Sequence, residues 1–370
     1  MACSGAVRRQ PLALSLLALL AAPLLVAGCS PAESEPVPGA SPLEVKTATP
    51  PPSPKPQRRP FTISFAGDVH FEGVLRNRLN ADPRTALGPI AAVLRRSNLT
   101  ALNLETAITT AGTPAPGKQF TFRAPATAFT ALKAAGVDVV TMANNHGMDY
   151  MESGLRDTLA AIRSSRFPVI GIGANETEAY RPYRRTVNGN RVSIIGATQV
   201  IDAQFIQSWT ASGDKAGLAS AKNEPRLLRA VRQARKNSDT VIVFLHWGAE
   251  LVKCPTPVQR SLADKLVAAG ADVIVGSHAH ILLGGGYSGR SYVHYGLGNF
   301  AFYNWGPETG TTGVLTLTIN GRKVLKDQWT PARINGGVPI PVTGGARQQA
   351  LGAYRALRGC TGLSAAPVDS

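Results

Sequence analysis

The sequence predicts a layered α/β protein in which helices cover the faces of β-sheets. Two observations support this fold class. Short apolar runs alternate along the chain with helical stretches, which is typical of strands joined by crossover helices. Two Asn-Gly pairs, Asn188-Gly189 and Asn320-Gly321, lie between β-rich runs and predict hairpin turns.

The predicted elements begin at residue 61 and follow one another in order. Apolar runs bounded by turn residues or polar clusters predict strands; these are residues 61–66, 99–104, 137–143, 168–173, 240–245, 272–275, 292–295 and 314–319. The longer stretches between them predict helices that cover the sheets; these are residues 84–96, 126–135, 151–164, 226–236 and 258–269.

The first residues of the chain indicate an export signal. Arg8 and Arg9 precede an apolar run, residues 12–27, that is too short and too proline-broken for a membrane-spanning helix. Val26-Ala27-Gly28 stands directly before Cys29, as in a bacterial lipobox. We therefore expect residues 1–28 to be a lipoprotein signal peptide and Cys29 to carry the lipid. The alternative is a soluble secreted protein in which Cys29 is incidental.

Residues 29–60 are predicted to be a proline-rich tether. Ten prolines lie between Ser30 and Pro60, with almost no large apolar residue. Such a segment buries too little surface to offset its ordering entropy and behaves as an extended spacer. Residues 61–370 would then form one domain on the extracytoplasmic face of the bacterial cell membrane, held there by the lipid.

The charge of the chain favours anionic partners. Lys and Arg number 39 against 23 Asp and Glu, a net charge of +16, which suits a phosphorylated envelope substrate or an acidic polymer. Compositional bias is the alternative. We expect no nucleic-acid partner, because no nucleic-acid motif and no basic run with interleaved aromatic residues is present.

The folded part contains two cysteines, Cys254 and Cys360. In an exported protein they can form a disulfide, provided that the fold brings them together. The sequence leaves this pairing open.

Side chains that can bind metal follow five of the apolar runs. They lie in Gly67-Asp68-Val69-His70, Asn103-Leu104-Glu105, Asn144-Asn145-His146, His246-Trp247-Gly248-Ala249-Glu250 and Gly276-Ser277-His278-Ala279-His280. Ligands of open α/β sheets gather beyond the carboxyl ends of the strands, so these clusters are expected to converge. Pairs such as His278 and His280 can point into one cavity, because an extended chain repeats its side-chain direction every two residues.

This donor set consists of imidazole, carboxylate and amide groups without cysteine, which suits Mn, Fe or Zn. There are too many donors for one tetrahedral ion, so two divalent ions are expected. Two ions can activate a water molecule and stabilise the leaving oxygen of a phosphoryl group. The alternative is that His278 and His280 are surface polar residues and that Asn145 and His146 cap the next helix. The sixth histidine, His294, is expected to serve packing, in the core or at the surface.

Together with Tyr295-Gly296-Leu297-Gly298-Asn299-Phe300, these motifs resemble the CapA poly-γ-glutamate capsule biosynthesis family, which is similar to the calcineurin-like dinuclear metallophosphoesterases. The resemblance covers about Ile63 to Phe300. It implies a four-layer α/β/β/α sandwich with the metal site at the C-terminal ends of the strands.

The resemblance also implies roles for individual residues. One ion would be held by Asp68, His70 and His280. A second would be held by Asn145, His246 and His278. Glu105 would bridge the two ions, and His146 would donate a proton to the leaving group.

Further residues are candidates for contacting substrate or supporting the ligands; they are Asn103, Arg123, Asp149, Glu250 and Asn299. Glu250 can orient His246 or touch substrate. Arg123 can clamp an anion with two hydrogen bonds or remain solvated. Asp149 can support the site or cap a helix.

The implied function is the biosynthesis of a capsule or another anionic envelope polymer, as a metal-dependent hydrolase or transferase on phosphoester or acyl bonds. The alternative is a non-catalytic factor that binds or assembles the polymer. Both share every ligand, and His146 separates them, because hydrolysis needs a proton donor beside the metals whereas binding does not. A nucleotidase would need an aromatic base-stacking site, which the sequence does not identify.

Overall fold

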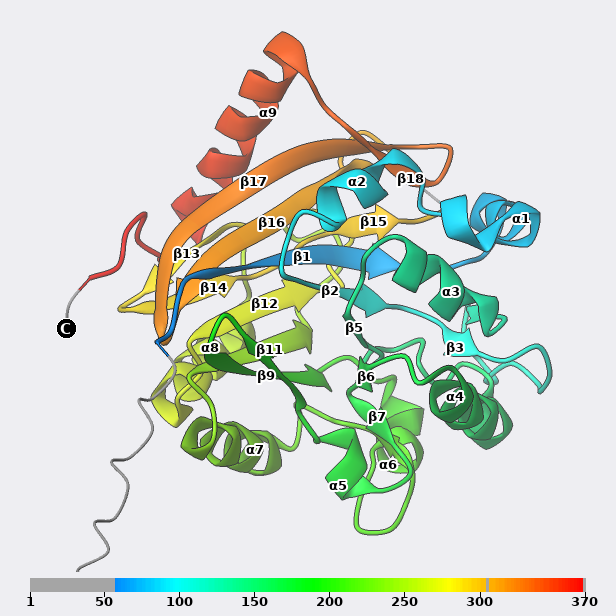
Figure 1. The fold of residues 1–370 in the computed structure, drawn as a ribbon. Helices are drawn as coiled ribbons and strands as arrows, with labels where there is room; N and C mark the ends of the chain where they lie inside the picture. Colours follow the sequence, from blue (N-terminus) through cyan, green and yellow to red (C-terminus); the bar gives the residue numbers. More distant parts are fainter. Residues whose placement is uncertain (1–56, 304–305, 369–370) are drawn as a thin grey trace, which may run out of the picture. The chain divides into compact units, whose positions relative to one another are not determined.

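The computed structural model describes residues 57–303 and 306–368. In this part of the chain two β-sheets pack face to face and helices cover both outer faces, which makes a four-layer α/β/β/α sandwich (Figure 1). The predicted fold class is confirmed. The signal peptide, Cys29 and most of the tether lie outside the described residues. Among the residues that are described, no helix is both long and apolar enough to cross a membrane.

The first sheet has the strand order β18-β17-β16-β1-β2-β5-β6, with β15 beside β1. Its strands are β1 (Phe61–Val69), β2 (Leu99–Leu104), β5 (Val139–Thr141), β6 (Val169–Ile170), β15 (Asn299–Ala301), β16 (Thr311–Asn320), β17 (Lys323–Asn335) and β18 (Val338–Pro341). Strands β1, β2, β5 and β6 are parallel. Their carboxyl ends therefore lie at one edge of the sheet.

The second sheet has the order β13-β14-β12-β11-β9-β8. Its strands are β8 (Tyr183–Val187), β9 (Asn190–Thr198), β11 (Thr240–His246), β12 (Val273–Ser277), β13 (Gly285–Ser288) and β14 (Ser291–His294). The middle four strands are parallel, and β8 and β13 are antiparallel edges. Both predicted Asn-Gly hairpins are present, between β8 and β9 and between β16 and β17.

The side chains of strand β11 alternate between the two faces of its sheet and so pack against two different layers. Ile242 and Phe244 point between the two sheets, while Val243 and its alternate neighbours pack under helices. The ring of Phe244 meets that of Phe65 on β1 at 6.1 Å between centroids. Because both faces of each sheet are covered, the central strands are mainly apolar.

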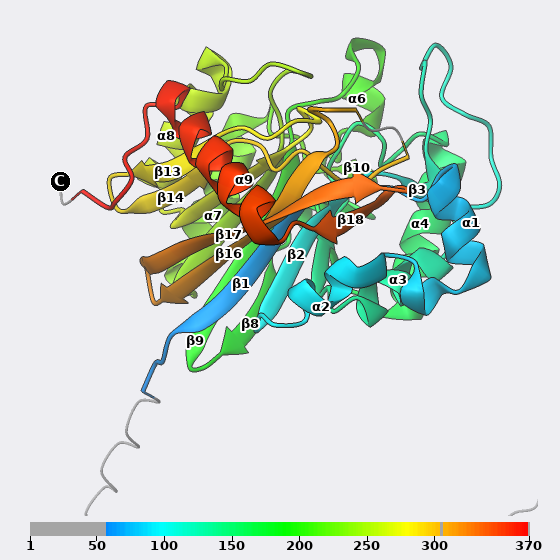
Figure 2. The ribbon, with the colours of Figure 1, turned by 90° about the horizontal axis from the view of Figure 1, so that it is seen from above.

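The helices divide between the two outer faces. Helices α1 (Val74–Ala81), α2 (Ala91–Leu94), α3 (Thr127–Ala134) and α4 (Met151–Ser165) pack on the first sheet, and α7 (Glu224–Lys236) and α8 (Pro257–Ala269) pack on the second. Helix α9 (Gly344–Ala356) lies across β17 (Figure 2), where Tyr354 stacks on Trp329 at 4.3 Å. His294 packs beside these two rings, as expected, with Nε2 2.9 Å from the Tyr354 hydroxyl.

Two predicted elements are wrong because glycine redirects the chain. The helix predicted at residues 84–96 is two 3₁₀ turns (Pro83–Thr85 and Gly88–Ile90) followed by α2, since Gly88 has a φ of +66° and is followed by proline. The strand predicted at residues 168–173 is divided by Gly171, whose φ is +83°, into β6 and β7 (Ile172–Gly173). Most other predicted elements differ by a few residues at their ends. Among the longer elements, α1 and α9 are not predicted, and β8, β9 and β17 are expected only as β-rich runs beside the Asn-Gly pairs, without bounds.

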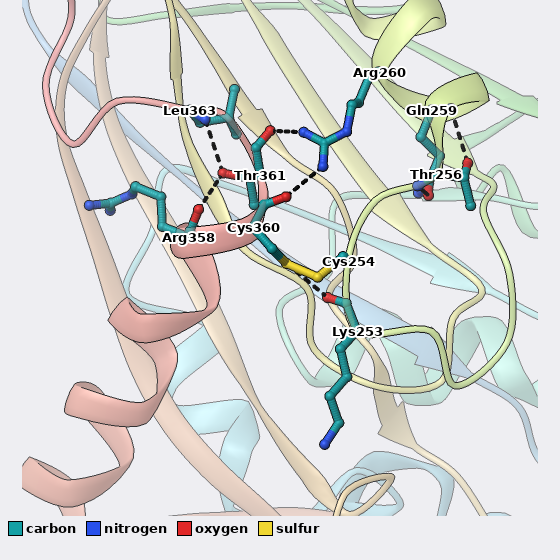
Figure 3. Close-up of a disulfide and its surroundings, with 9 residues drawn as sticks. All are labelled: Lys253, Cys254, Thr256, Gln259, Arg260, Arg358, Cys360, Thr361 and Leu363. Carbon is teal, nitrogen blue, oxygen red and sulfur yellow. Dashed lines mark hydrogen bonds between the residues drawn. A yellow bond between two sulfur atoms is a disulfide. The ribbon is translucent and has the colours of Figure 1, made fainter.

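The disulfide that the sequence left open is present between Cys254 and Cys360, with 5.7 Å between their Cα atoms (Figure 3). It joins the loop after β11 to the 3₁₀ turn that follows α9 (Leu357–Cys360). Arg260 on α8 donates hydrogen bonds to the carbonyl oxygens of Cys360 and Thr361. The C-terminal segment is thus tied to the second sheet by a covalent bond and by a guanidinium group.

The last residues assigned to the tether contact the domain. Arg58 forms an ion pair with Asp239 at 2.9 Å. The Asn188 side chain donates to the carbonyl oxygen of Pro60, and the Asn190 side chain donates to that of Arg59. The chain therefore enters β1 along the β8–β9 hairpin.

Candidate metal centre

Strand register places Asp68 beside polar residues of its two neighbouring strands. Asp68 on β1 is paired with Asn103 on β2 and with Asn299 on β15. The preceding Gly67 is required there, because a Cβ at this position would lie 1.8 Å from the carbonyl oxygen of Gly298. That oxygen instead accepts a hydrogen bond from the Asp68 amide at 2.9 Å.

Asn103 is buried at the centre of the polar network. Its Nδ2 donates to Asp68 Oδ1 at 2.8 Å and lies 3.2 Å from His246 Nδ1, while its Oδ1 accepts from Asn144 at 2.9 Å. Asn144 Oδ1 in turn accepts from the His146 amide at 3.0 Å. The buried side-chain amide of Asn103 therefore positions side chains that come from β1, from β11 and from the loop after β5.

Two groups of side chains have their potential ligand atoms within 4.8 Å of one another. The first group is Asp68, Glu105 and His246, and all three are buried. The second group is Glu250, His278 and His280, of which Glu250 is exposed. The structure thus brings residues 68, 105, 246, 278 and 280 together after the ends of their strands, although they divide into groups differently from the expected ligand sets. Their role as metal ligands stays a prediction. Glu250, expected to contact substrate or orient His246, stands among the possible ligands.

Glu105 has a buried carboxylate that the protein does not neutralise. Its Oε1 has no hydrogen-bond partner among the described residues, and it lies 3.7 Å from His146 Nε2 and 3.9 Å from His246 Nε2. Burial, with smaller contributions from the nearby carboxylates of Asp68 and Asp149, raises the pKa of Glu105 well above its usual range. A buried carboxylate of this kind needs a cation or a proton.

The surrounding histidines are held neutral. Burial, followed by neighbouring histidines, lowers the pKa of His278 to about 3 and that of His246 well below 6.5. His278 Nδ1 is buried without a hydrogen-bond partner in the described residues. Neutral imidazoles present the lone pairs that metal ions bind. Buried carboxylates without a cationic partner and uncharged imidazoles with a free lone pair are together complementary to a divalent cation. The residues therefore fit the expected metal.

The backbone is strained at two of the possible ligands. His278 and His280 have φ values of 98° and 58°, in a region that residues other than glycine rarely occupy. His280 Nδ1 lies 2.8 Å from Asn299 Oδ1 and 3.6 Å from Asp68 Oδ2, so Asn299 orients this ring. In these conformations the His280 ring lies beside Asp68, and the His278 ring lies 4.7 Å from that of His246 between centroids.

His146 and Asn145 face the first group. Asn145 Oδ1 lies 2.7 Å from His246 Nε2, and the two atoms can serve the same ion. His146 Nδ1 lies 2.6 Å from Asp149 Oδ2, which leaves Nε2 directed towards Glu105. Asp149 also accepts the Phe122 amide, and the Phe122 ring stacks on His146 at 4.1 Å. The orientation of His146 is thereby set by a carboxylate and an aromatic ring.

Lys118 is a residue of this network that the sequence did not indicate. Its Nζ lies 2.7 Å from Asp149 Oδ1 and 5.2 Å from the centre of the Trp209 ring, and its side chain is only 6% exposed. It also donates to the carbonyl oxygen of Asn145. Lys118 follows a stretch rich in glycine and proline that resembles an ordinary surface loop, so no local signal identifies it.

Two predicted site residues, His70 and Arg123, belong to neither group and form no hydrogen bond to a member of either in the described part of the chain. The ring nitrogens of His70 face the backbone amides of Glu72 at 3.0 Å and Tyr303 at 3.1 Å. A neutral ring accepts only one hydrogen bond, so one of these two contacts is not a hydrogen bond. Arg123 lies over the ring of Tyr150 at 5.0 Å. Aromatic rings also surround His70, with Phe122 at 4.7 Å and Phe302 at 4.3 Å.

Comparison with known sequences identifies a family. A family model described as bacterial capsule synthesis protein PGA_cap matches residues 62–304. The chain is 34% identical over 219 residues to a capsule biosynthesis protein CapA of Bacillus anthracis, which covers 58% of the chain and 52% of the relative. It is 31% identical over 220 residues to a PGA biosynthesis protein CapA of Bacillus subtilis, which covers 57% and 54%. The chain thus spans about half the length of these curated relatives.

Solved structures resemble this chain at lower sequence identity than these relatives do. A hypothetical protein from Thermus thermophilus superposes with a TM-score of 0.47 at 17% identity, covering 74% of this chain and all of the other. A protein described as a novel phosphatase from Mycoplasma pneumoniae has a TM-score of 0.45 at 13% identity, covering 79% and 98%.

Proposed function

The chain belongs to the family of the bacterial capsule synthesis protein PGA_cap, and from this membership we propose that it acts in the synthesis or processing of an anionic capsule polymer of the poly-γ-glutamate type. We place it on the extracytoplasmic face of the cell membrane, where lipidated Cys29 would anchor it. In this role it is a metal-dependent hydrolase or transferase. Its substrate is a phosphoester or acyl bond in the polymer or in a phosphorylated envelope precursor.

The observation that carries this proposal is the uncompensated Glu105 carboxylate among neutral imidazoles. Such an arrangement destabilises the protein unless a cation or a proton neutralises the carboxylate, and the neutral imidazoles beside it favour the cation. Asp68, Glu105 and His246, with Asn145 beside them, would hold one divalent ion, and Glu250, His278 and His280 a second. His70 is left out of both sets because its ring nitrogens face backbone amides. The nitrogen and oxygen donors suit Mn, Fe or Zn.

Divalent ions in such a site supply Lewis-acid activation of water and of a phosphoryl or acyl oxygen. The chain itself supplies the proton donor. Burial lowers the pKa of His146, and Asp149, 2.6 Å from Nδ1, acts in the opposite direction by favouring the imidazolium form. Nε2 faces the ligands. The ammonium group of Lys118 forms an ion pair with Asp149, which partly balances the charge of this carboxylate and holds it in position. His146 can therefore give a proton from Nε2 to a leaving oxygen.

The test compares His146→Ala with His278→Ala, measuring metal content and turnover together. The wild type is expected to bind about two transition ions per chain. His146→Ala should keep both ions while kcat falls about 10²–10⁴-fold, the usual contribution of a general acid. His278→Ala should lose metal and turnover together, because His278 is assigned to coordination.

The choice of leaving group makes the test sharper. A phosphodiester with an acidic leaving group needs little protonation, so the defect of His146→Ala should be smaller on it than on an alkyl ester. Equal defects on both esters would reject the acid role of His146. A chain that binds metal and retains capsule polymer, yet turns over no ester or amide, would instead be a non-catalytic polymer-binding or assembly factor.

A further inference from the structure

A second anion site is suggested by a hollow on the outer face of the second sheet. It encloses about 580 Å³ between α5 (Glu176–Ala179), α7 and the start of β8. Helices α5 and α7 lie beside each other in the lower half of Figure 1. Six cationic side chains line it; they are Arg181, Arg184, Arg226, Arg229, Arg232 and Lys236. We call these residues the basic groove. Its lining shares no residue with either possible metal-ligand group.

The pattern of α7 explains why the arginines face outward together. The apolar residues of this helix are buried against the second sheet; they are Leu227, Ala230, Val231 and Ala234. Arg226, Arg229 and Arg232 recur every third residue on another side of the helix. At 1.5 Å of rise per residue, the Cα atoms of successive arginines in this series are about 4.5 Å apart along the helix axis. The helix therefore presents a regular row of cations.

Most of this charge is left without an acidic partner. Glu176 pairs with Arg226 at 3.0 Å, and Glu178 pairs with Arg181 at 3.1 Å. The remaining cations, Arg184, Arg229, Arg232 and Lys236, form no ion pair within the part of the chain that the structure describes. Among the described residues no acid lines the groove. Like charges gathered in this way repel one another, and an anionic ligand would relieve that repulsion.

One of the arginines is already held in position. The side chain of Arg226 is 16% exposed, and its guanidinium lies 4.4 Å from the centre of the Tyr180 ring. The Tyr180 hydroxyl is itself fixed by a hydrogen bond to the carbonyl oxygen of Ser220 at 2.8 Å. A guanidinium that is stacked on a ring and paired through Nε still has free N–H groups for a second anion.

Arg184 extends the groove along the edge strand β8. It also lines an adjoining hollow of about 240 Å³ that contains Arg185 and Arg191, of which Arg191 is already paired with Asp239 at 3.1 Å. The cations thus continue past the end of the groove, which suits an elongated ligand better than a single small anion. Charged residues on an edge strand also discourage strand pairing, but that reason does not extend to Arg229 and Arg232, which lie on a helix.

We propose that the basic groove binds an extended polyanion with regularly spaced carboxylates, as a retention site separate from the metal centre. The carboxylates would pair with the arginine row, since a guanidinium binds a carboxylate through two parallel hydrogen bonds. The identification of this ligand as capsule polymer rests on the proposed function. A polymer is favoured over a membrane surface because the cations line a hollow, and none of the exposed large apolar residues of the described chain belongs to it.

The experiment uses the full chain in neutral phosphatidylcholine nanodiscs and fluorescein-labelled poly-γ-glutamate as the probe, with binding followed by fluorescence anisotropy. The groove variant is Arg184→Gln/Arg229→Gln/Arg232→Gln. The control variant, Arg96→Gln/Arg156→Gln/Arg163→Gln, removes the same charge from exposed arginines elsewhere. The groove variant should bind about 10- to 100-fold more weakly, since each exposed ion pair contributes up to about a fivefold factor. The control should change by less than about threefold.

Three results would overturn the inference while leaving the proposed function intact. Equal losses in both triple variants would show non-specific attraction to a basic protein. Unchanged polymer binding in the groove variant, with loss of binding in Glu105→Gln, would place the polymer at the metal centre only. If the groove variant instead lost affinity for added phosphatidylglycerol vesicles and kept the polymer, the groove would be a membrane contact. Failure of the wild type to bind either polymer or metal would contradict the proposed function itself.

Discussion

At the scale of single residues, Glu105 shows the tension between stability and function. Its carboxylate is buried, its Oε1 has no hydrogen-bond partner among the described residues, and burial raises its pKa. No requirement of the fold explains an acid at this position, because an amide would fill the same space without the charge. The residue is best explained by what it can bind.

This explanation predicts opposite effects of Glu105→Gln with and without metal. In EDTA the free energy of unfolding of the variant should exceed that of the wild type by about 1–2 kcal/mol. The wild type must bury a charge or take up a proton in order to fold, and the variant needs neither. With Mn or Zn at about 100 times its dissociation constant, the wild type should gain about 2.7 kcal/mol and the variant clearly less. Thermal unfolding in both conditions measures this.

Glu308→Gln is the matched control, since Glu308 is an exposed carboxylate paired only with Lys253 in the described structure. It should respond to metal as the wild type does. A Glu105→Gln chain that is less stable in EDTA and gains as much from metal as the wild type would exclude Glu105 from coordination.

His294 offers a pH test that is separate from the metal centre. Burial lowers its pKa to about 3 from an ordinary 6.5. The unfolded chain therefore binds more protons below pH 6.5, so the stability that His294 contributes is complete above pH 6.5 and is lost as the pH falls towards 3. At pH 5 this loss should be about 2 kcal/mol.

The comparison is between the wild type and His294→Gln in urea, at pH 8 and pH 5 in EDTA. The other histidines are common to both proteins, so the difference isolates His294. The wild type should lose about 2 kcal/mol more than the variant on going from pH 8 to pH 5. Parallel losses would mean that His294 is accessible to protons in the folded protein.

At the scale of elements, the C-terminal segment and the loop that carries Glu250 are joined by one covalent bond. The disulfide closes a separation of 106 residues between Cys254 and Cys360, while the amide of Leu251 in the same loop donates to the carbonyl oxygen of Ala279 at 2.9 Å. This loop is therefore attached both to the segment after α9 and to the strained loop that carries His278 and His280.

We predict that Cys254→Ser/Cys360→Ser lowers the free energy of unfolding by about 4 kcal/mol, because a loop of about 100 residues is no longer closed in the unfolded chain. Urea unfolding of the wild type in dithiothreitol should give a similar loss. The double variant should be insensitive to the reductant. A wild type whose urea midpoint is the same with and without dithiothreitol would show that this pair does not stabilise the fold.

At the scale of the whole molecule, the location of the protein is tested at Cys29, which lies outside the described residues. If Cys29 carries the proposed lipid, Cys29→Ala is expected to release the chain from the membrane fraction or to leave it uncleaved, because the thiol to which the lipid would be attached is removed. Fractionation and labelling with a radioactive fatty acid measure this. Cys3→Ala, which changes a cysteine within the signal, is the control and should behave as the wild type. Unchanged labelling of Cys29→Ala would remove the lipoprotein assignment.

The sequence alone was sufficient for the alternation of strands and helices and for the clusters after each strand, because both depend on local patterns. The carboxyl ends of parallel strands meet at one edge, so Asp68, Glu105 and His246 could be expected together without knowledge of their contacts. Tertiary structure decided which of them share a group. It turned His70 towards backbone amides, placed Lys118 against Asp149, paired Cys254 with Cys360, and brought α5, α7 and β8 together around the basic groove. These outcomes depend on how a loop closes or which face of a helix packs, and such choices are set by residues far away in the sequence.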